Sequence, residues 1–417
     1  MRVQWSTSKA VNASIVQFGK SAKLGGHASG GARQYLAEFG WHHSALLPGP
    51  LAAGATYFYR VGDGVSAWSR VLSFVAPAVM AGPDVPVALS IFGDMGYQNS
   101  STRPMFIALE GLAKHWSASF TYEMLRGQID RGEVNGVWHL GDVGYADDSW
   151  AHSLNSFAYE ANYNGYMRWL EPIAARVPYI VSPGNHESEC YSPACMLNPH
   201  AWVRPLSNFS AFNSRWTMPF AKAHGATSNM WYSFDLGPLH VVSLNSETDW
   251  KGAGEETTGD SHLKEFPAGS FGREGEYLAW LEDDLSRAAQ ARAAGGGPAW
   301  IVTGSHRPYD ELERSHGALF RRYGVDAYFG GHHHSYTREA HRYDGGSNET
   351  LLAVVVGGAG CDEMAQVPKS NQTGMGRASF HAARYAAGVL KANKTTLTWR
   401  LLDSADGSLL DEVALTR

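Results

Sequence analysis

The pattern of apolar and polar positions along the chain changes near residue 80. Before that point, short runs such as residues 3–5 and 57–61 alternate between apolar and polar side chains, and turns rich in glycine and proline separate them. Alternation with a period of two is typical of strands that bury one face. The first 80 residues therefore predict a small all-β module, and they contain no residue pattern that points to chemistry.

A proline-rich stretch at residues 76–86 predicts the linker that ends this module. After it, continuous apolar runs alternate with segments of helical periodicity, which is the pattern of an α/β domain. The apolar runs predict strands at Val87–Phe92, Gly136–Leu140, Tyr179–Ser182, His240–Leu244, Ala299–Thr303, Val325–Phe329 and Leu351–Val356. Helices are expected at Thr121–Arg131, Tyr159–Ile173, Tyr277–Ala294 and Gly317–Tyr323, and two antiparallel strands at Thr395–Leu402 and Leu409–Leu415. We thus expect two domains, at residues 1–80 and 86–417.

Composition narrows the class of protein. The chain has 417 residues, 44% of them hydrophobic and 18% charged, which is ordinary for a folded globular protein with a large core. A formal net charge of −6 without a long basic run argues against a nucleic-acid partner. No apolar stretch reaches the length needed to cross a bilayer, so no membrane span is expected.

Cysteines and glycosylation motifs bear on the compartment. Cys190 and Cys195 lie close enough in sequence to close a disulfide, but three free thiols, with Cys361 as the third, fit the count equally well. Asn-x-Ser/Thr motifs exceed the roughly two expected by chance and favour a secreted glycoprotein. These motifs begin at Asn12, Asn99, Asn208, Asn348, Asn371 and Asn393. The first residues lack the apolar segment of a signal peptide, so we expect a mature form or a fragment, or else unused motifs.

Polar residues with metal-binding side chains follow five of the predicted strands, each beside a glycine. The blocks are Gly93-Asp94-Met95-Gly96, Gly141-Asp142-Val143-Gly144-Tyr145, Pro183-Gly184-Asn185-His186-Glu187, Gly304-Ser305-His306-Arg307-Pro308 and Gly330-Gly331-His332-His333-His334. In open α/β sheets the carboxyl ends of the strands form the edge where ligands bind. We therefore expect these five blocks to meet at one edge.

The pooled side chains offer oxygen and imidazole donors, which suit hard to borderline metals and need no thiolate. A carboxylate can bridge two ions roughly 3.5–4 Å apart, and Asp142 is our candidate for that bridge. In an extended segment His332 and His334 would point the same way toward neighbouring ions, while His333 would point away. The pattern therefore predicts a two-metal site.

In this order, the blocks GDMG, GDVGY, GNHE, GSH-RP and GHHHSYTR resemble the purple acid phosphatase branch of the calcineurin-like metallophosphoesterases. The resemblance covers nearly the whole chain and includes the segments WYSFDLGPLHVVSLNSETDW and GGAGCDE. Tyr145 marks this branch, because other metallophosphoesterases lack a tyrosine ligand there. The implied fold is α/β (α+β), a metallophosphoesterase β-sandwich flanked by helices.

The resemblance also covers the first module, for which the implied fold is a fibronectin type III-like sandwich. Leu51, Gly54 and Tyr57 resemble the corner of such a sandwich, where a tyrosine hydroxyl is tied to the preceding turn. The segment is short for this fold, so we expect one or two edge strands to be missing before Met1.

The resemblance implies a role for each site residue. Asp94, Asp142, Tyr145 and His334 would hold Fe(III), and Asp142, Asn185, His306 and His332 would hold a divalent Fe, Zn or Mn. His186 would contact the substrate phosphate, and His316 would protonate the leaving group. Two positions depart from the family pattern: Ser305 replaces the commoner glycine before His306, and the loop at residues 310–315 before His316 matches no pattern of the family.

The implied activity is hydrolysis of small phosphate monoesters by direct attack of a metal-bound hydroxide on phosphorus, which a trivalent ion keeps available at acidic pH. The resemblance places the protein outside the cell or in a vacuole or lysosome. One alternative is a phosphodiesterase on the same metal scaffold; another is an inactive scaffold or adhesion protein, although every inferred ligand is present. The sequence leaves open whether the protein is a monomer or a homodimer.

Overall fold

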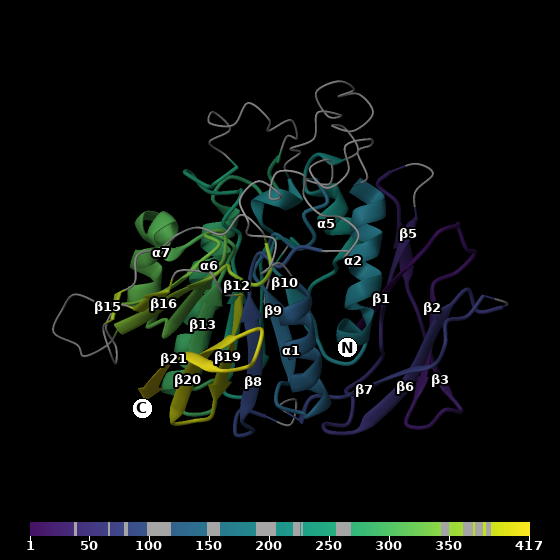
Figure 1. The fold of residues 1–417 in the computed structure, drawn as a ribbon, viewed down its shortest axis with the longest axis horizontal. Coiled ribbons are helices and arrows are strands. Elements are labelled where there is room, and N and C mark those ends of the chain that lie inside the picture. The colour runs from purple at the N-terminus through teal and green to yellow at the C-terminus, as the bar shows by residue number, and fades with distance from the viewer. Residues whose placement is uncertain are drawn as a thin grey trace.

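The computed structural model describes residues 1–36, 40–65, 67–78, 82–97, 118–147, 159–188, 206–219, 226, 228–255, 268–342, 350–361, 370–371, 378–380 and 385–417. Two small sheets form the N-terminal part of the molecule, on the right of Figure 1, and two large sheets form the rest. The predicted pair Cys190 and Cys195 lies outside the described residues. Within them, no helix is both long and apolar enough to cross a membrane.

The N-terminal part is all β, as its alternating pattern predicts. One sheet has the order β1-β5-β4 and the other β3-β2-β6-β7. Their strands are β1 (Arg2–Thr7), β2 (Ile15–Gly19), β3 (Gly26–Ser29), β4 (Gly31–Arg33), β5 (Trp41–Leu46), β6 (Thr56–Gly62) and β7 (Leu72–Val75). Alternate side chains of β6, namely Tyr57, Tyr59 and Val61, are buried in a core separate from that of the large sheets. The Tyr57 hydroxyl accepts a hydrogen bond from the Ala52 amide at 3.1 Å, which is the tie to the preceding turn that the sequence predicts.

The first large sheet has the order β10-β9-β8-β19-β20-β21. Its strands are β8 (Val87–Phe92), β9 (Gly136–His139), β10 (Tyr179–Val181), β19 (Ala386–Ala392), β20 (Thr396–Asp403) and β21 (Leu409–Thr416). β8, β9 and β10 are parallel, whereas β19 pairs antiparallel with β8 and connects them to the C-terminal hairpin.

The second large sheet has the order β11-β12-β13-β14-β16-β15-β18-β17. Its strands are β11 (Tyr232–Leu236), β12 (Leu239–Ser243), β13 (Trp300–Gly304), β14 (Ala327–Gly330), β15 (Tyr336–Arg342), β16 (Thr350–Val356), β17 (Ser370–Asn371) and β18 (Ala378–Phe380). Its central strands β12, β13, β14 and β16 are parallel, and β15 folds back antiparallel onto β16.

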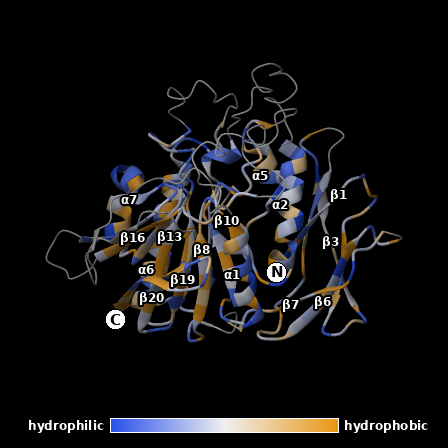
Figure 2. Cartoon of the chain, in the orientation of Figure 1, coloured by the Kyte–Doolittle hydropathy of each residue, from blue (hydrophilic) through white to orange (hydrophobic). Residues whose placement is uncertain are grey.

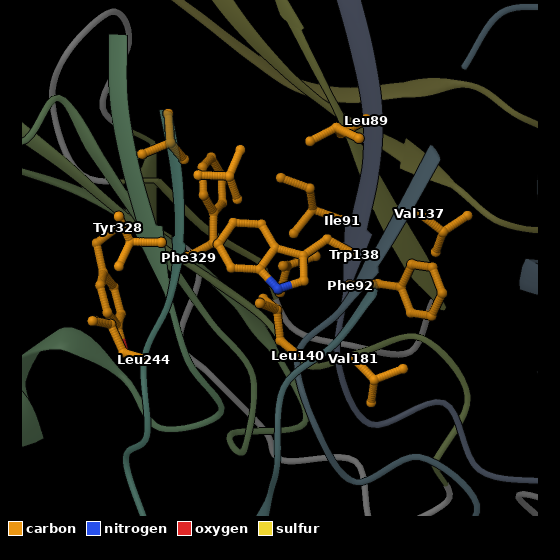
Figure 3. Close-up of a cluster of buried hydrophobic side chains, with 14 of the residues drawn as sticks. Leu89, Ile91, Phe92, Val137, Trp138, Leu140, Val181, Leu244, Tyr328 and Phe329 are labelled. Carbon is orange, nitrogen blue, oxygen red and sulfur yellow. The ribbon is translucent and has the colours of Figure 1, made fainter. Parts of the chain in front are cut away.

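The two large sheets pack face to face through bulky apolar side chains. Trp138 reaches from β9 of the first sheet toward Phe329 of the second (Figure 3), and a Cβ on Gly304 of β13 would lie 2.8 Å from the Trp138 ring. The rings of Phe329 and Trp399 are 4.8 Å apart across the same layer. Every residue of β8, β9, β12 and β13 is buried, because each sheet is covered on both faces. Continuous apolar runs are the sequence signature of this burial.

Helices cover the outer faces of the sandwich (Figure 1). α1 (Ala118–Asp130) and α2 (Tyr159–Ala174) pack against each other beside the first sheet, and α6 (Glu276–Ala293) and α7 (Tyr309–Tyr323) contact β13 and β14 of the second. A short helix, α5 (Ser210–Arg215), and a 3₁₀ turn, η3 (Asn185–Glu187), follow β10. Figure 2 shows apolar colour concentrated in the strands between these helices. The structure confirms the expected class, an all-β domain followed by an α/β sandwich flanked by helices.

The N-terminal sheets are joined to the larger part by polar contacts. Arg215 of α5 bonds to the Tyr35 hydroxyl at 2.8 Å and to Glu160 of α2 at 2.7 Å, and the Arg215 and Glu160 side chains are both buried. Tyr59 donates to the carbonyl of Ala175 at 2.9 Å. The boundary itself, which we place at residues 80–86, stays a prediction.

The strands with polar ends belong to both large sheets, as the implied β-sandwich predicts, so their loops converge from both halves of the sandwich and not along one edge of an open sheet. One predicted helix boundary is wrong. α7 begins at Tyr309, eight residues before the predicted start at Gly317, and therefore includes His316. The sequence pattern also missed β19, whose alanine-rich stretch shows no alternation; its Gly388 lies directly against the Trp399 ring, where a Cβ would have no room.

Candidate metal centre

The loops that follow β8, β9, β10, β13 and β14 meet at one end of the sandwich. They bring the predicted ligands together in a single cluster, and all but His332 are buried. The cluster contains Asp94, Asp142, Tyr145, Asn185, His306, His332 and His334. Because the seven side chains come from five loops that are far apart in the sequence, only the folded chain can assemble them.

A first group surrounds Tyr145. Ligand atoms of Asp94, Asp142 and His334 all lie within 4.8 Å of one another. The Tyr145 hydroxyl is 2.9 Å from His334 Nε2, 3.3 Å from Asp94 Oδ1 and 3.5 Å from Asp142 Oδ2. A phenol, an imidazole and two carboxylates therefore face a common point.

A second group surrounds His306. Ligand atoms of Asp142, His306 and His332 lie within 4.8 Å of one another. His306 Nε2 is 3.0 Å from Asp142 Oδ2, 2.9 Å from Asn185 Oδ1 and 3.2 Å from His332 Nδ1. The other ring nitrogen, His306 Nδ1, lies 2.8 Å from the Leu140 carbonyl, to which it can only donate, so Nε2 is left as the ligand atom.

The donor set fits a pair of ions. Asp142 belongs to both groups, as a bridging carboxylate must. Asp94 and Asp142 are 0% and 1% exposed, and burying two carboxylates this close is costly without compensating positive charge. Oxygen and imidazole donors suit Fe, Zn or Mn.

Four residues of the cluster have a backbone conformation that L-residues seldom adopt. Their φ angles are +60° for Asp94, +51° for Asp142, +48° for Tyr145 and +63° for His332. Such left-handed non-glycine residues cost free energy and gather at functional sites. The concentration of this strain in the predicted ligands supports a functional role for the cluster.

His332 also corrects the geometry that we expected for the three consecutive histidines. The segment is not extended, because His332 is left-handed and the His333 amide donates to the Gly331 carbonyl at 2.7 Å. The expected outcome nevertheless holds: His332 faces the second group, His334 faces the first, and the His333 side chain is 54% exposed. A tight turn rather than strand alternation separates the two predicted ligands.

Glycines allow the loops to approach this closely. A Cβ on Gly184 would lie 2.3 Å from Asp142 Oδ1 and 2.9 Å from His306 Cγ. Gly141 has φ +82°, and a Cβ there would lie 2.8 Å from Gly184 and from His306 Nδ1. The close approach of these two loops therefore requires glycine at positions 141 and 184.

The charges in the cluster push neighbouring pKa values apart. Burial alone would lower the pKa of His306, but Asp142 and Asp94 raise it to about 10. Burial and the charge of His306 lower the pKa of the adjacent His332 to about 2. Burial raises the pKa of Tyr145 well above its usual value, and Cys361 and Asp94 add to the effect. Opposed shifts of this kind are typical of functional sites.

His186 lies at the edge of the cluster. Its Nδ1 is 2.9 Å from Asp147 Oδ2, its Nε2 is 4.0 Å from Asp142 Oδ2, and its ring packs against Tyr145 with centroids 4.3 Å apart. Its side chain is 9% exposed, whereas those of Asp94 and His306 are 0% exposed. The predicted phosphate contact is thus close to the predicted ligands and more exposed than Asp94 and His306.

His316 is not brought into the cluster by any described contact. It lies on α7, fully buried, with Nε2 2.9 Å from the Tyr277 hydroxyl and Nδ1 2.6 Å from Ser315 Oγ. Its ring packs edge-on against Trp250. Burial lowers the pKa of His316 to about 3, so the ring is neutral at mildly acidic pH. The role of proton donor stays a prediction that these surroundings do not favour.

Sequence reasoning assigned no role to Glu187, the last residue of the GNHE block. Its carboxylate accepts hydrogen bonds from the amides of Asp142, Val143 and Gly184, each at 2.9 Å. It thereby ties the turn after β9 to the turn after β10. The only sequence signal was its place directly after His186.

Comparisons with known proteins agree with this geometry. Family models described as the N-terminal domain of purple acid phosphatase, calcineurin-like phosphoesterase and iron/zinc purple acid phosphatase-like protein C match residues 1–76, 91–336 and 352–412. Mouse acid phosphatase type 7 is 30% identical over 403 residues, which cover 87% of this chain and 76% of that protein. Probable purple acid phosphatase 20 of Arabidopsis thaliana is 26% identical over 360 residues, covering 82% and 67%.

A solved structure shares the fold. The purple acid phosphatase PPD1 from yellow lupin (Lupinus luteus) seeds superposes with a TM-score of 0.68 at 19% identity, covering 100% of this chain and 72% of that one. The match to the calcineurin-like phosphoesterase model spans more than half of the chain and contains all the predicted ligands. The chain belongs to the purple acid phosphatase family of the calcineurin-like phosphoesterases.

Proposed function

We propose that the protein is an acid phosphatase that hydrolyses small phosphate monoesters at a dinuclear metal centre. The observation that carries the proposal is the pair of ligand groups sharing Asp142, one of which includes the Tyr145 hydroxyl. Family membership points to the same activity, since the relatives are named acid phosphatases.

Each group is assigned one ion. Asp94, Asp142, Tyr145 and His334 hold Fe(III), and Asp142, Asn185, His306 and His332 hold a divalent Fe, Zn or Mn. When bound, the ions supply Lewis acidity and a water nucleophile that is available at acidic pH. The distances within each group and the glycines that permit them support the assignment.

The chain's own residues bind and orient the substrate. Asp147 Oδ2 accepts a hydrogen bond from His186 Nδ1–H at 2.9 Å, which orients the ring and directs Nε2 toward Asp142. A protonated His186 can then donate from Nε2 to a phosphate oxygen and offset its charge. The carboxylate of Glu187 keeps the Asp142 and Asn185 turns in register, so that the donors do not reorganise during the reaction.

Exposed glycosylation motifs support the proposed compartment. Among the described motifs, Asn12, Asn208 and Asn393 are all exposed. They support a glycoprotein that is secreted or vacuolar-lysosomal, and a mobility shift after endoglycosidase treatment of protein from a secreting host tests it. The homodimer stays a prediction that light scattering can check.

The test of activity compares the rates at which the protein hydrolyses a chromogenic phosphate monoester and the matching diester at about pH 5. The acidic pH is chosen because a trivalent ion lowers the pKa of bound water. The protein is purified without chelators. Strong monoester turnover, weak diester turnover and a coloured sample support the proposal. Preference for the diester moves the protein to the phosphodiesterase alternative, and no turnover with metal bound favours an inactive scaffold.

A further inference from the structure

Arg307 is a nearly buried cation beside the second group, and the proposed reaction gives it no role. It directly follows His306, and its side chain is 11% exposed. Its Nη1 lies 3.5 Å from His332 Nε2. A guanidinium this close to His306 and His332, two of the predicted ligands, needs an explanation.

Three carboxylates surround Arg307. Its Nε is 3.0 Å from Glu247, its Nη2 is 3.4 Å from Glu255 and its Nη1 is 3.3 Å from Glu311. The side chains of Glu247 and Glu255 are 0% and 2% exposed, so these pairs are shielded from water. Because the acidic groups outnumber the guanidinium, Arg307 is not a free positive charge for a phosphate.

The loop after β12 is shaped to hold this arginine. Ser246 Oγ accepts from the Arg307 amide at 3.2 Å and donates to Glu247 at 2.7 Å, and the Glu255 amide donates to the Glu247 carbonyl at 2.8 Å. A Cβ on Gly254 would lie 1.9 Å from Arg307 Nε. The guanidinium is thus enclosed by the carboxylates of Glu247 and Glu255 and by the backbone at Gly254. We call this arrangement the Arg307 clamp.

The Arg307 clamp lies beside the His332 ring nitrogen that faces away from the second group. His332 Nδ1 faces His306 Nε2 at 3.2 Å, so it is the nitrogen that faces the second group. Its Nε2 faces Arg307 Nη1, and the carboxylate of Glu311 lies within 4.8 Å of a His332 nitrogen. The groups beside the outer nitrogen of a ligating imidazole set the orientation of its ring. Arg307 Nη1 lies beside that nitrogen and also holds Glu311 at 3.3 Å.

We propose that Arg307, clamped by Glu247 and Glu255, is a positioning residue that fixes Glu311 and His332 for the divalent ion. This inference rests on the proposed assignment of His306 and His332 to that ion. It predicts that disturbing Arg307 weakens the second group and leaves the Tyr145 group intact.

Two variants test it without removing the positive charge at residue 307. Arg307→Lys keeps the charge but cannot reach three carboxylates at once. Gly254→Ala changes no charge and pushes the guanidinium away, since its Cβ would lie 1.9 Å from Nε. Arg338→Lys is the matched control, because Arg338 is 1% exposed and paired with Asp411 at 2.6 Å, with no described contact to a ligand.

The divalent ion is removed with a chelator and Zn²⁺ alone is titrated back, with metal content measured by elemental analysis and the iron centre followed by its visible band. Arg307→Lys and Gly254→Ala are expected to bind Zn²⁺ about tenfold or more weakly with the visible band unchanged, and Arg338→Lys to behave as wild type.

Wild-type Zn²⁺ affinity in both variants, or loss of the visible band in step with zinc, would overturn the inference. His332→Ala separates it from the proposed function. If His332→Ala loses Zn²⁺ and the Arg307 variants do not, the inference alone fails. If His332→Ala also keeps its Zn²⁺ affinity, the assignment of the second group fails and the inference falls with it.

Discussion

The two groups of the centre share Asp142 but differ in charge. Around Tyr145 the donors are two carboxylates, a phenol and one imidazole, whereas around His306 they are the shared carboxylate, an amide and two imidazoles. The first set can carry up to three negative charges and the second only one. Hard anionic oxygens suit a trivalent ion, and a mostly neutral set suits a divalent one. One bridging residue thus joins two environments of different charge.

The groups also differ in how they are held. Left-handed residues occur in both groups: Asp94 and Tyr145 in the first, His332 in the second and the shared Asp142. The His306 group is in addition held by residues outside it, namely the Leu140 carbonyl at His306 and Arg307 at His332. Single substitutions should therefore separate the two groups more readily on the His306 side.

The largest effect is expected where the groups meet. Asp142→Asn removes the shared negative charge, so both ions should bind weakly and phosphatase activity should fall on the order of 10³-fold, since metal charge stabilisation contributes several kcal/mol. Elemental analysis and the visible band measure the two ions separately. Retention of either ion at full stoichiometry would show that Asp142 does not bridge.

Two matched substitutions should split the centre in opposite directions. Tyr145→Phe should abolish the visible colour and keep the divalent ion, whereas His332→Ala should keep the colour and lose the divalent ion. Each should lower activity by about 100-fold, because one ion of the pair remains. If both variants lost both ions, the groups would be one cooperative site and the contrast between them would be wrong.

A smaller loss of activity is expected when the backbone is disturbed at Gly184 than when a predicted ligand is replaced. Gly184→Ala places a Cβ 2.3 Å from Asp142 Oδ1, so the bridge must move and activity should fall by about tenfold to 100-fold. The added methyl should also cost about 1–3 kcal/mol of stability. Gly296→Ala is the control, because nothing lies within 4 Å of its Cβ and its φ is not positive. Equal activity in the two variants would show that the close approach at Gly184 does not matter.

The same contrast separates what the sequence could predict from what it could not. The predicted ligands stand out in the sequence because their blocks contain a glycine and follow an apolar run, as those of Asp94 and Asp142 do. The apolar pattern alone does not divide the strands between two sheets, since β8 and β13 are both continuous buried runs, and only the family resemblance implied the sandwich. The GGHHH pattern does not indicate the left-handed turn at His332, and the residues around Arg307, at positions 247, 255 and 311, are separated in the sequence by α6 and β13. Local patterns show donors but not the partners that tertiary packing brings to them.

The smallest catalytic effect is expected at His316, which lies outside both groups. His316→Gln keeps a hydrogen-bonding group near Tyr277 and removes the titrating ring. A general acid contributes roughly 10²–10⁴-fold, most for poor leaving groups. Because burial lowers the pKa of His316 to about 3, we expect instead less than about a threefold change in kcat for both an alkyl and a nitrophenyl phosphate. A much larger loss with the alkyl ester would restore His316 as the proton donor.

Stability should respond to the same substitution in a pH-dependent way. In the folded protein His316 stays neutral down to a pKa of about 3, whereas in the unfolded chain it binds a proton below about 6.5. Protonation therefore favours the unfolded state as pH falls from about 6.5 to about 3, and the wild type should lose stability across that window. His316→Gln should be less stable at pH 7 but lose less on acidification. Thermal unfolding at pH 7 and pH 4.5 measures the difference, and an equal acid-induced drop in Tm for both proteins would show that the His316 ring is protonated in the fold, as a proton donor requires.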